Sequence, residues 1–243
     1  MRPLLAVLIV FAFAAIAVAA TALGSASKAP IEPANTAPRA TADPAHDARV
    51  DVRRTMGSSP GQGRGISPVI RGLLLPIDGA TIPTDLELLP NSARDYRAGW
   101  HEGIDFAADR GTPVRAAAAG TVIRVDREFV EWDAAEQSAA LEAAIAIGYT
   151  PDETLDRIRG RQVWIAHERA VVTRYAHLEA VADLYVGQSV TRGQVIGTVG
   201  SSGFEEGGPH LHFEVRVGDD YLGDRLEGDA LVRAITRSFD RLP

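Results

Sequence analysis

The sequence predicts a mainly β fold: an antiparallel β-sandwich or barrel-like domain that carries an inserted α-helical hairpin. Short β-type runs recur from Ile66 onward, and Gly and Pro residues separate them at close spacing, which is typical of such sheets. Two helix-capping signals within residues 127–160 predict the hairpin. With 46% apolar and 23% charged residues among 243, the chain can bury a substantial core.

The N-terminal 66 residues differ from this pattern. Residues 4–20 form an unbroken apolar run after a short basic start. We expect residues 1–23 to be a signal peptide or, if uncleaved, a membrane anchor, because the run approaches the roughly 20 residues that span a bilayer. Residues 24–66 are rich in Ala, Pro and Ser and are expected to be a disordered linker. The folded domain then covers residues 67–243, in the periplasm, in the cell envelope or secreted.

Within that domain, four runs are the clearest strands: residues 121–125, 162–166, 170–175 and 195–199. Each is five or six residues long, contains β-branched or aromatic residues, and is short enough for an antiparallel sheet.

Residues 127–160 interrupt the strands with helical signals. Residues 133–136 (Asp-Ala-Ala-Glu) form a capping box that begins an Ala-rich helix, which Gly148 ends. Residues 150–153 (Thr-Pro-Asp-Glu) form a second capping box with proline at the first helical position, and Gly160 ends that helix. The sequence therefore predicts a helical hairpin between two strands.

The two helices of this hairpin should pack through their apolar side chains. Leu141 and Ile145, four residues apart, are expected to lie on the sheet or on Leu155 and Ile158.

Composition excludes several classes of function. Residues 67–243 hold 18 bases and 28 acids, a net charge of −10, which excludes non-specific nucleic-acid binding by phosphate neutralisation. The chain has no cysteine, so disulfides, thiolate nucleophiles and Cys-based zinc fingers are excluded.

Histidines and a carboxylate recur at spacings that suit a metal site. His101 and Asp105 are four residues apart, and on a strand they would share a face, as would His210 and His212. Two histidines and one carboxylate form a catalytic zinc ligand set that leaves a fourth position for water. Zinc lowers the pKa of that water and polarises a carbonyl, while further histidines can assist as acid, base or oxyanion donor.

Four ordered motifs surround these residues. They are Trp100-His101-Glu102-Gly103-Ile104-Asp105-Phe106, Gly111-Thr112-Pro113-Val114, Tyr175-Ala176-His177-Leu178 and Gly208-Pro209-His210-Leu211-His212-Phe213-Glu214. Together they resemble the lysostaphin-like, LytM-type zinc metallopeptidases, many of which cut peptide cross-links in bacterial peptidoglycan. The resemblance covers most of residues 70–217, and residues 127–160 interrupt it.

This resemblance implies a site and an activity. His101, Asp105 and His212 match the ligands of one Zn²⁺ per chain, and His177 and His210 match the two catalytic histidines that activate water and stabilise the transition state. The implied protein is an exported hydrolase with a duplicated hybrid-motif domain. It would be a zinc metalloendopeptidase acting on peptidoglycan cross-links or stem peptides.

The alternative is a non-catalytic LytM-type regulator or wall-binding module that controls another cell-wall hydrolase. Loss of ligands would mark such a protein, and no ligand is lost here. The hairpin at 127–160 replaces what is normally a short turn, and three roles stay open for it. It walls the groove, occludes it until an activating protein partner binds, or braces the sheet.

Other polar residues receive lesser roles. His167 is expected to be structural, and Arg97 and Tyr175 are expected to line the groove. Glu214 shares a strand face with His212 and would either orient that histidine or pair with an arginine. Glu102 would point away from the site and is rejected as a general base.

Overall fold

The computed structural model describes residues 70–240. The predicted signal peptide or anchor at 1–23 and the predicted linker at 24–66 lie outside the described residues. Across 70–240, none of the helices combines the length and apolarity that crossing a bilayer requires.

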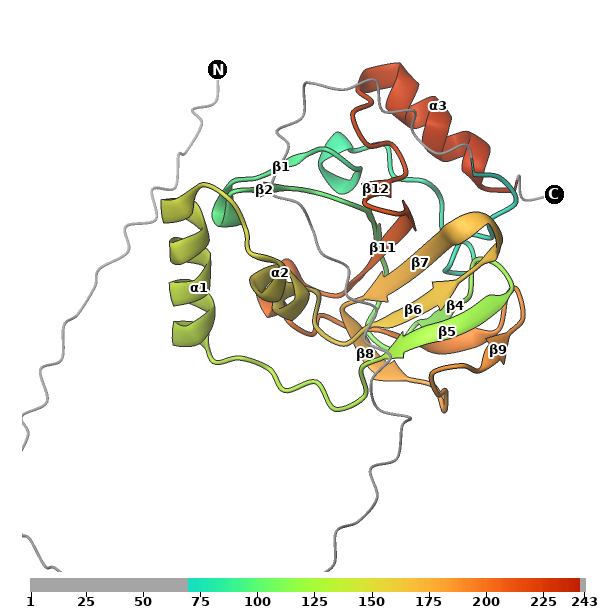
Figure 1. Cartoon of the computed structure of the whole chain (residues 1–243), viewed down its shortest axis with the longest axis horizontal. Coiled ribbons are helices and arrows are strands. Elements are labelled where there is room, and N and C mark those ends of the chain that lie inside the picture. Colours follow the sequence, from blue (N-terminus) through green and yellow to red (C-terminus); the bar gives the residue numbers. More distant parts are fainter. Residues whose placement is uncertain (1–69, 241–243) are drawn as a thin grey trace, which may run out of the picture. The chain divides into compact units, whose positions relative to one another are not determined.

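A seven-stranded antiparallel sheet dominates the fold, as the sequence predicted (Figure 1). Its strands follow the order β12-β11-β7-β6-β5-β9, and β3 also pairs with β11. They are β3 (Ile104–Ala107), β5 (Gly120–Val125), β6 (Val163–Ala166), β7 (Val171–Ala176), β9 (Ser189–Val190), β11 (His210–Val217) and β12 (Asp220–Tyr221).

Two smaller sheets complete the strands. One has the order β4-β10-β8, and the other pairs β1 with β2. Their strands are β1 (Ala93–Arg94), β2 (Gly99–Trp100), β4 (Pro113–Arg115), β8 (Leu178–Val181) and β10 (Val195–Val199). Short 3₁₀ turns connect these elements: η2 (Leu86–Leu88), η3 (Asp95–Arg97), η4 (Glu168–Ala170) and η5 (Glu205–Gly207).

Strand β11 separates the hydrophobic core from a polar face. Leu211, Phe213 and Val215 are buried in the core, where Phe213 contacts Phe106 and Tyr175 with ring centroids 6.3 and 5.2 Å apart. Because successive side chains on a strand point to opposite faces, the intervening His210, His212, Glu214 and Arg216 share the other face. The core thus holds rigidly the strand that carries the polar residues.

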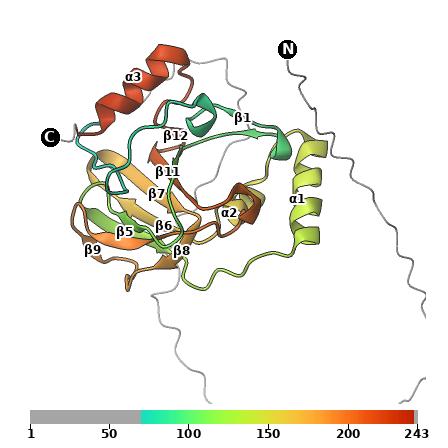
Figure 2. The same ribbon diagram turned by 180° about the vertical axis from the view of Figure 1, so that it is seen from behind.

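The helical hairpin lies between β5 and β6 in the chain, as predicted. Helix α1 (Ala134–Ile147) begins at the capping box of Asp133 and Glu136, and Gly148 ends it in the left-handed conformation. Helix α2 (Asp152–Arg159) ends at Gly160. In both views, α2 lies between α1 and the large sheet (Figure 1, Figure 2).

Two details of the predicted hairpin are wrong. Pro151 is the N-cap of α2 and makes no side-chain cap, because the Thr150 hydroxyl instead bonds the backbone of Arg97. Ile145 is 51% exposed rather than packed, since α1 buries only Gln137 and Ala144 among its side chains. Helix α1 therefore presents most of its Ala-rich surface outward.

The last helix, α3 (Gly228–Ser238), was not among the predicted elements. It buries Leu231 and Ile235 in the core while its opposite face carries Arg233 and Arg237, the amphipathic pattern of a surface helix.

Candidate active site

Three predicted residues bring their donor atoms together at one point. Asp105 on β3 and His212 on β11 are directly opposite in the strand register, and His101 enters from the connection between β2 and β3. His101 Nε2 lies 3.0 Å from Asp105 Oδ1 and 3.0 Å from His212 Nδ1, and His212 Nδ1 lies 2.8 Å from Asp105 Oδ1. The expectation that His101 and Asp105 share one strand is wrong, because the chain turns at Gly103.

Gly103 is required at that turn. A Cβ there would lie 2.6 Å from the Phe213 carbonyl oxygen and 2.8 Å from the His212 ring. Glycine thus allows the His101 segment to approach β11 closely enough for the three donor atoms to meet.

Hydrogen bonds with partners outside the group set which ring nitrogen of each of these two histidines is left to face Asp105. His101 Nδ1–H donates to the Leu89 carbonyl at 2.9 Å, and His212 Nε2–H donates to Glu214 Oε1 at 3.1 Å. A carbonyl or carboxylate oxygen only accepts, so the remaining nitrogens, His101 Nε2 and His212 Nδ1, face Asp105. Such outer partners orient metal-binding histidines.

The charges of the site favour a cation at this point. Burial alone would lower the pKa of His212, but its hydrogen bonds with Asp105 and Glu214 outweigh burial and raise it. Burial alone would raise the pKa of Asp105, but the charges and hydrogen bonds of His101 and His212 hold it well below its usual range. A His–Asp–His group that attracts positive charge can hold a metal ion, and the three donor atoms are grouped as such a site requires.

The two predicted catalytic histidines lie beside this group. The ring centroid of His177 lies 4.6 Å from that of His210 and 5.9 Å from that of His212. His210 Nε2 lies 4.0 Å from Asp105 Oδ1. His177 Nδ1–H donates to the Ser202 carbonyl and His210 Nδ1–H donates to the Gly208 carbonyl, each at 2.9 Å. Both rings therefore carry their proton on Nδ1 and leave Nε2 as the basic nitrogen.

His177 is held in an unusual backbone conformation. Its φ of 59° lies in the left-handed region, which costs energy for a residue other than glycine and recurs at functional sites. Burial, with smaller contributions from His210 and His212, lowers the pKa of His177 to about 3. The ring is therefore neutral at ordinary pH.

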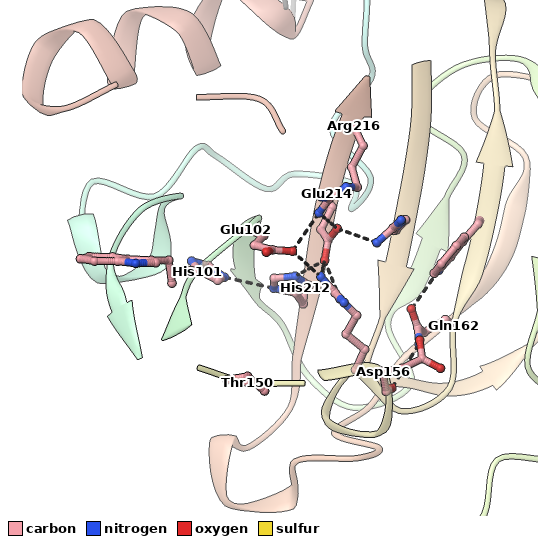
Figure 3. A network of polar contacts seen from close by, with 12 residues as sticks. His101, Glu102, Thr150, Asp156, Gln162, His212, Glu214 and Arg216 are labelled. Atoms are coloured by element: carbon pink, nitrogen blue, oxygen red, sulfur yellow. Dashed lines mark hydrogen bonds and ion pairs between the residues drawn. The ribbon is translucent and has the colours of Figure 1, made fainter. Parts of the chain in front are cut away.

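A buried ionic network lies behind His212 (Figure 3). Glu214 is fully buried and accepts hydrogen bonds from both His212 and Arg159, while Arg216 bridges Glu214 and Glu102. Both roles that the sequence left open for Glu214 thus apply together. Glu102 bonds Arg159 and Arg216 and also lines the cleft, so the expectation that it points away from the site is wrong.

The donor atoms open onto a cleft of about 290 Å³. Its lining includes Arg97, as predicted, together with Leu155 and Ile158 from α2. Tyr175 does not line it: the side chain is fully buried, and its hydroxyl accepts a hydrogen bond from Ala117 N–H at 2.7 Å.

His167 also has a structural position, as expected. Its Nδ1–H donates to the Ala119 carbonyl and its Nε2 accepts from the Thr173 hydroxyl, each at 2.8 Å.

The helical hairpin holds two segments that border the cleft. On one side, Gly203 C=O accepts from Trp132 Nε1–H at 3.0 Å, and Gly203 N–H donates to Glu131 at 2.8 Å. On the other side, Thr150 exchanges hydrogen bonds with Arg97 of η3. These tertiary contacts gave no signal in the sequence.

Two aromatic residues next to these contacts stack on each other. Tyr96 precedes Arg97, and Phe204 follows Gly203. Their ring centroids lie 5.0 Å apart, and the interplanar angle is 17°. Both rings line the cleft. The stack joins η3 to the loop that leads into β11.

Comparisons with known proteins agree with this geometry. The family model described as Peptidase family M23 matches residues 99–223, which include all five predicted site residues. The DD-carboxypeptidase/endopeptidase Mpg of Neisseria meningitidis is 38% identical over 117 residues, which are 48% of this chain and 20% of that protein. The peptidoglycan DD-endopeptidase ShyC of Vibrio cholerae is 32% identical over 117 residues, with the same two shares.

Among solved structures, a zinc-containing peptidase from Vibrio cholerae is similar with a TM-score of 0.44 and 28% identity. That match covers 66% of this chain and 41% of the solved chain. The curated relatives are much longer proteins, and this chain spans about one fifth of their length.

Proposed function

This chain belongs to peptidase family M23, and from that premise we propose that it is a zinc-dependent metalloendopeptidase acting on peptidoglycan. One observation carries the proposal. The His101–Asp105–His212 donor group opens onto a cleft beside two further histidines, each with its basic Nε2 nitrogen available. The reaction is the hydrolysis of a peptide bond into a carboxylate and an amine.

Zinc suits the donor set. His101 Nε2, Asp105 Oδ1 and His212 Nδ1 would hold the ion, and two histidines with one carboxylate are a common catalytic zinc set. In a tetrahedral zinc site, neighbouring donor atoms are about 3.3 Å apart, which is within a few tenths of an ångström of the separations here. When bound, zinc supplies a Lewis acid for the scissile carbonyl and lowers the pKa of water to about 7.

His177 and His210 would move the protons of the reaction. One of them accepts the proton of the attacking water at Nε2, where the ring is basic, and donates it to the nitrogen of the departing amine. The other would stabilise the oxyanion that develops on the scissile carbonyl. The Ser202 and Gly208 carbonyls hold both rings in the required orientation through Nδ1–H.

Peptidoglycan peptides are the proposed substrate because the relative from Vibrio cholerae is named a peptidoglycan DD-endopeptidase and that from Neisseria meningitidis a DD-carboxypeptidase/endopeptidase. Such a substrate lies outside the cytoplasm, which supports export by residues 1–23, as a cleaved signal or as a membrane tether, with 24–66 as a linker. Residues 67–243 would be the catalytic domain. The exposed α1 surface of the 127–160 hairpin is available to an activating protein partner.

The test is to incubate the full-length chain with zinc and purified peptidoglycan, beside His212→Ala. New primary amines and their fragments in mass spectrometry should appear with the wild type only. A zinc chelator should abolish them, and added zinc should restore them. A chain that binds zinc tightly and releases no fragment would refute the proposed substrate. A wild type that binds no zinc would instead support the regulatory alternative.

A further inference from the structure

Arg159, the last residue of helix α2, reaches from the hairpin into the ionic network behind His212. Its side chain is only 7% exposed, although most of the α1 surface is exposed. Arg159 Nε donates to Glu214 Oε1 at 2.6 Å, and its Nη2 donates to Glu102 Oε2 at 2.7 Å. The guanidinium thus joins the insertion to β11 and to the segment before β3 through two buried carboxylates, Glu214 and Glu102.

The oxygen that Arg159 contacts is the one that orients His212. Glu214 Oε1 accepts both Arg159 Nε–H and His212 Nε2–H, the latter at 3.1 Å. Because Nε2 holds its proton for Glu214, His212 turns Nδ1 toward Asp105, 2.8 Å away. The position of Glu214 Oε1 therefore decides which nitrogen His212 presents to the donor group.

The other arginines cannot replace this contact. Arg216 and Arg174 bond the opposite oxygen, Glu214 Oε2, at 3.0 and 3.4 Å. With Arg159 removed, both remaining cations would attract Oε2, and Oε1 would keep only its hydrogen bond with the His212 ring. A buried carboxylate is costly unless hydrogen bonds satisfy it, so the carboxylate would shift toward the remaining guanidinium groups.

The backbone of the same residue supports the second side of the site. The Arg159 carbonyl accepts the His177 N–H at 2.9 Å, and His177 Nδ1–H in turn bonds Ser202. Gly160 packs directly on Ser202, where an added Cβ would lie 2.1 Å from the carbonyl oxygen. The end of α2 is therefore fixed between His212 and His177.

We infer that Arg159 is a positioning residue of the metal site: it holds Glu214 so that His212 presents Nδ1, and the inserted hairpin thereby completes the active site. This rests on the proposed function, because it takes His101, Asp105 and His212 as zinc ligands. Among the three roles left open by the sequence, none included a contribution of this hairpin to the metal site itself.

The experiment measures zinc affinity, which a purely structural role would leave unchanged. Full-length Arg159→Gln, Arg159→Lys and the matched control Arg157→Gln are titrated with zinc against a fluorescent chelator. Arg157 lies on the same helix but is 40% exposed and outside the network. We expect Arg159→Gln to bind zinc about 10- to 100-fold more weakly, as for other lost outer partners of ligating histidines. Lysine should recover part of this loss, and Arg157→Gln should bind like the wild type.

Nitrogen-15 NMR of the histidine rings gives a second readout. With zinc bound, the wild type should show His212 protonated at Nε2 alone, and Arg159→Gln should show a mixture of the two tautomers. Folded Arg159→Gln protein with wild-type zinc affinity and an unchanged His212 tautomer would overturn the inference.

A double-mutant cycle keeps the inference testable if folding is impaired. If Arg159 acts through Glu214, the Arg159→Gln change should alter zinc affinity less than threefold in a Glu214→Gln background. A full additional loss there would overturn the inference. If Arg159→Gln binds zinc more weakly but the wild type cleaves no peptidoglycan, only the proposed substrate is refuted and the inference stands. A wild type without zinc binding would overturn both.

Discussion

Replacing Gly160 by alanine, and comparing the loss of stability with that at a matched glycine, should measure how tightly the end of the hairpin is packed. The comparison removes the backbone strain that alanine suffers in either conformation. Gly160 has a φ of +64° and ψ of −138°, a conformation that costs an alanine about 1–3 kcal/mol. The new Cβ would also lie 2.1 Å from the Ser202 oxygen and 2.3 Å from its carbonyl carbon. Both atoms are backbone, so the main chain must shift, at a further cost of about 1–3 kcal/mol.

Gly148, on the same hairpin, is the matched control. Its φ of +80° also disfavours alanine, at a cost of about 1–2 kcal/mol, but a Cβ there has no atom within 4 Å. Replacing glycine by alanine lowers the entropy of the unfolded chain equally at both positions, and the difference between variants cancels this effect. We therefore expect Gly160→Ala to lose about 2 kcal/mol more of unfolding free energy than Gly148→Ala.

Thermal unfolding and equilibrium denaturation with urea measure this difference. For a domain of this size, each kcal/mol corresponds to about 2–4 °C in Tm, so Gly160→Ala should melt at least about 4 °C below Gly148→Ala. Its kcat/KM should also fall, because Ser202 positions His177. Equal Tm shifts for the two variants would refute the argument that Gly160 is required by contact with Ser202.

Three further predictions concern other parts of the fold. His167→Ala should lower the free energy of unfolding by about 1–3 kcal/mol without changing kcat, since the Ala119 carbonyl and Thr173 each lose a hydrogen bond and Thr173 keeps only that with the Tyr175 hydroxyl; a lowered kcat at full folding would contradict its structural role. Replacing residues 128–159 by a short turn should weaken zinc binding, because Arg159 is removed, and raised activity would instead indicate that the hairpin occludes the cleft. Burial raises the pKa of Tyr175 to about 12, above its ordinary value. Because the unfolded chain releases the phenol proton at a lower pH than the folded chain, the contribution of Tyr175 to the free energy of unfolding is complete below about pH 10 and is lost as pH rises through 12. Denaturation between pH 9 and 12 should show this loss, roughly 2–3 kcal/mol, and Tyr175→Phe should lack it.

Local patterns in the sequence were sufficient for the four strands that we predicted and for the first helix. Each of the four predicted runs overlaps a strand, and the Asp133 capping box forms because both of its partners lie within four residues. The five site residues could be recognised because their motifs follow one order along the chain. Their convergence depends on the β3–β11 register, which local patterns do not contain.

Contacts with residues far away in the sequence explain two features that local patterns did not contain. The Thr150 hydroxyl could have capped α2, but Arg97 lies close enough in the fold to bind it first. Arg159 had no distinguishing signal, because an arginine in the last turn of a helix usually interacts with solvent and the helix dipole. Only the packing of α2 onto β11 turns that side chain inward to Glu214.

The stacked rings of Tyr96 and Phe204 join two segments that border the cleft, and both rings line it. A peptide bound in the cleft would therefore lie against this aromatic pair. The hairpin holds both segments, through Thr150 at Arg97 on one side and Trp132 at Gly203 on the other. The insertion thus sets the width of this border of the cleft, although it lies far from it in the sequence.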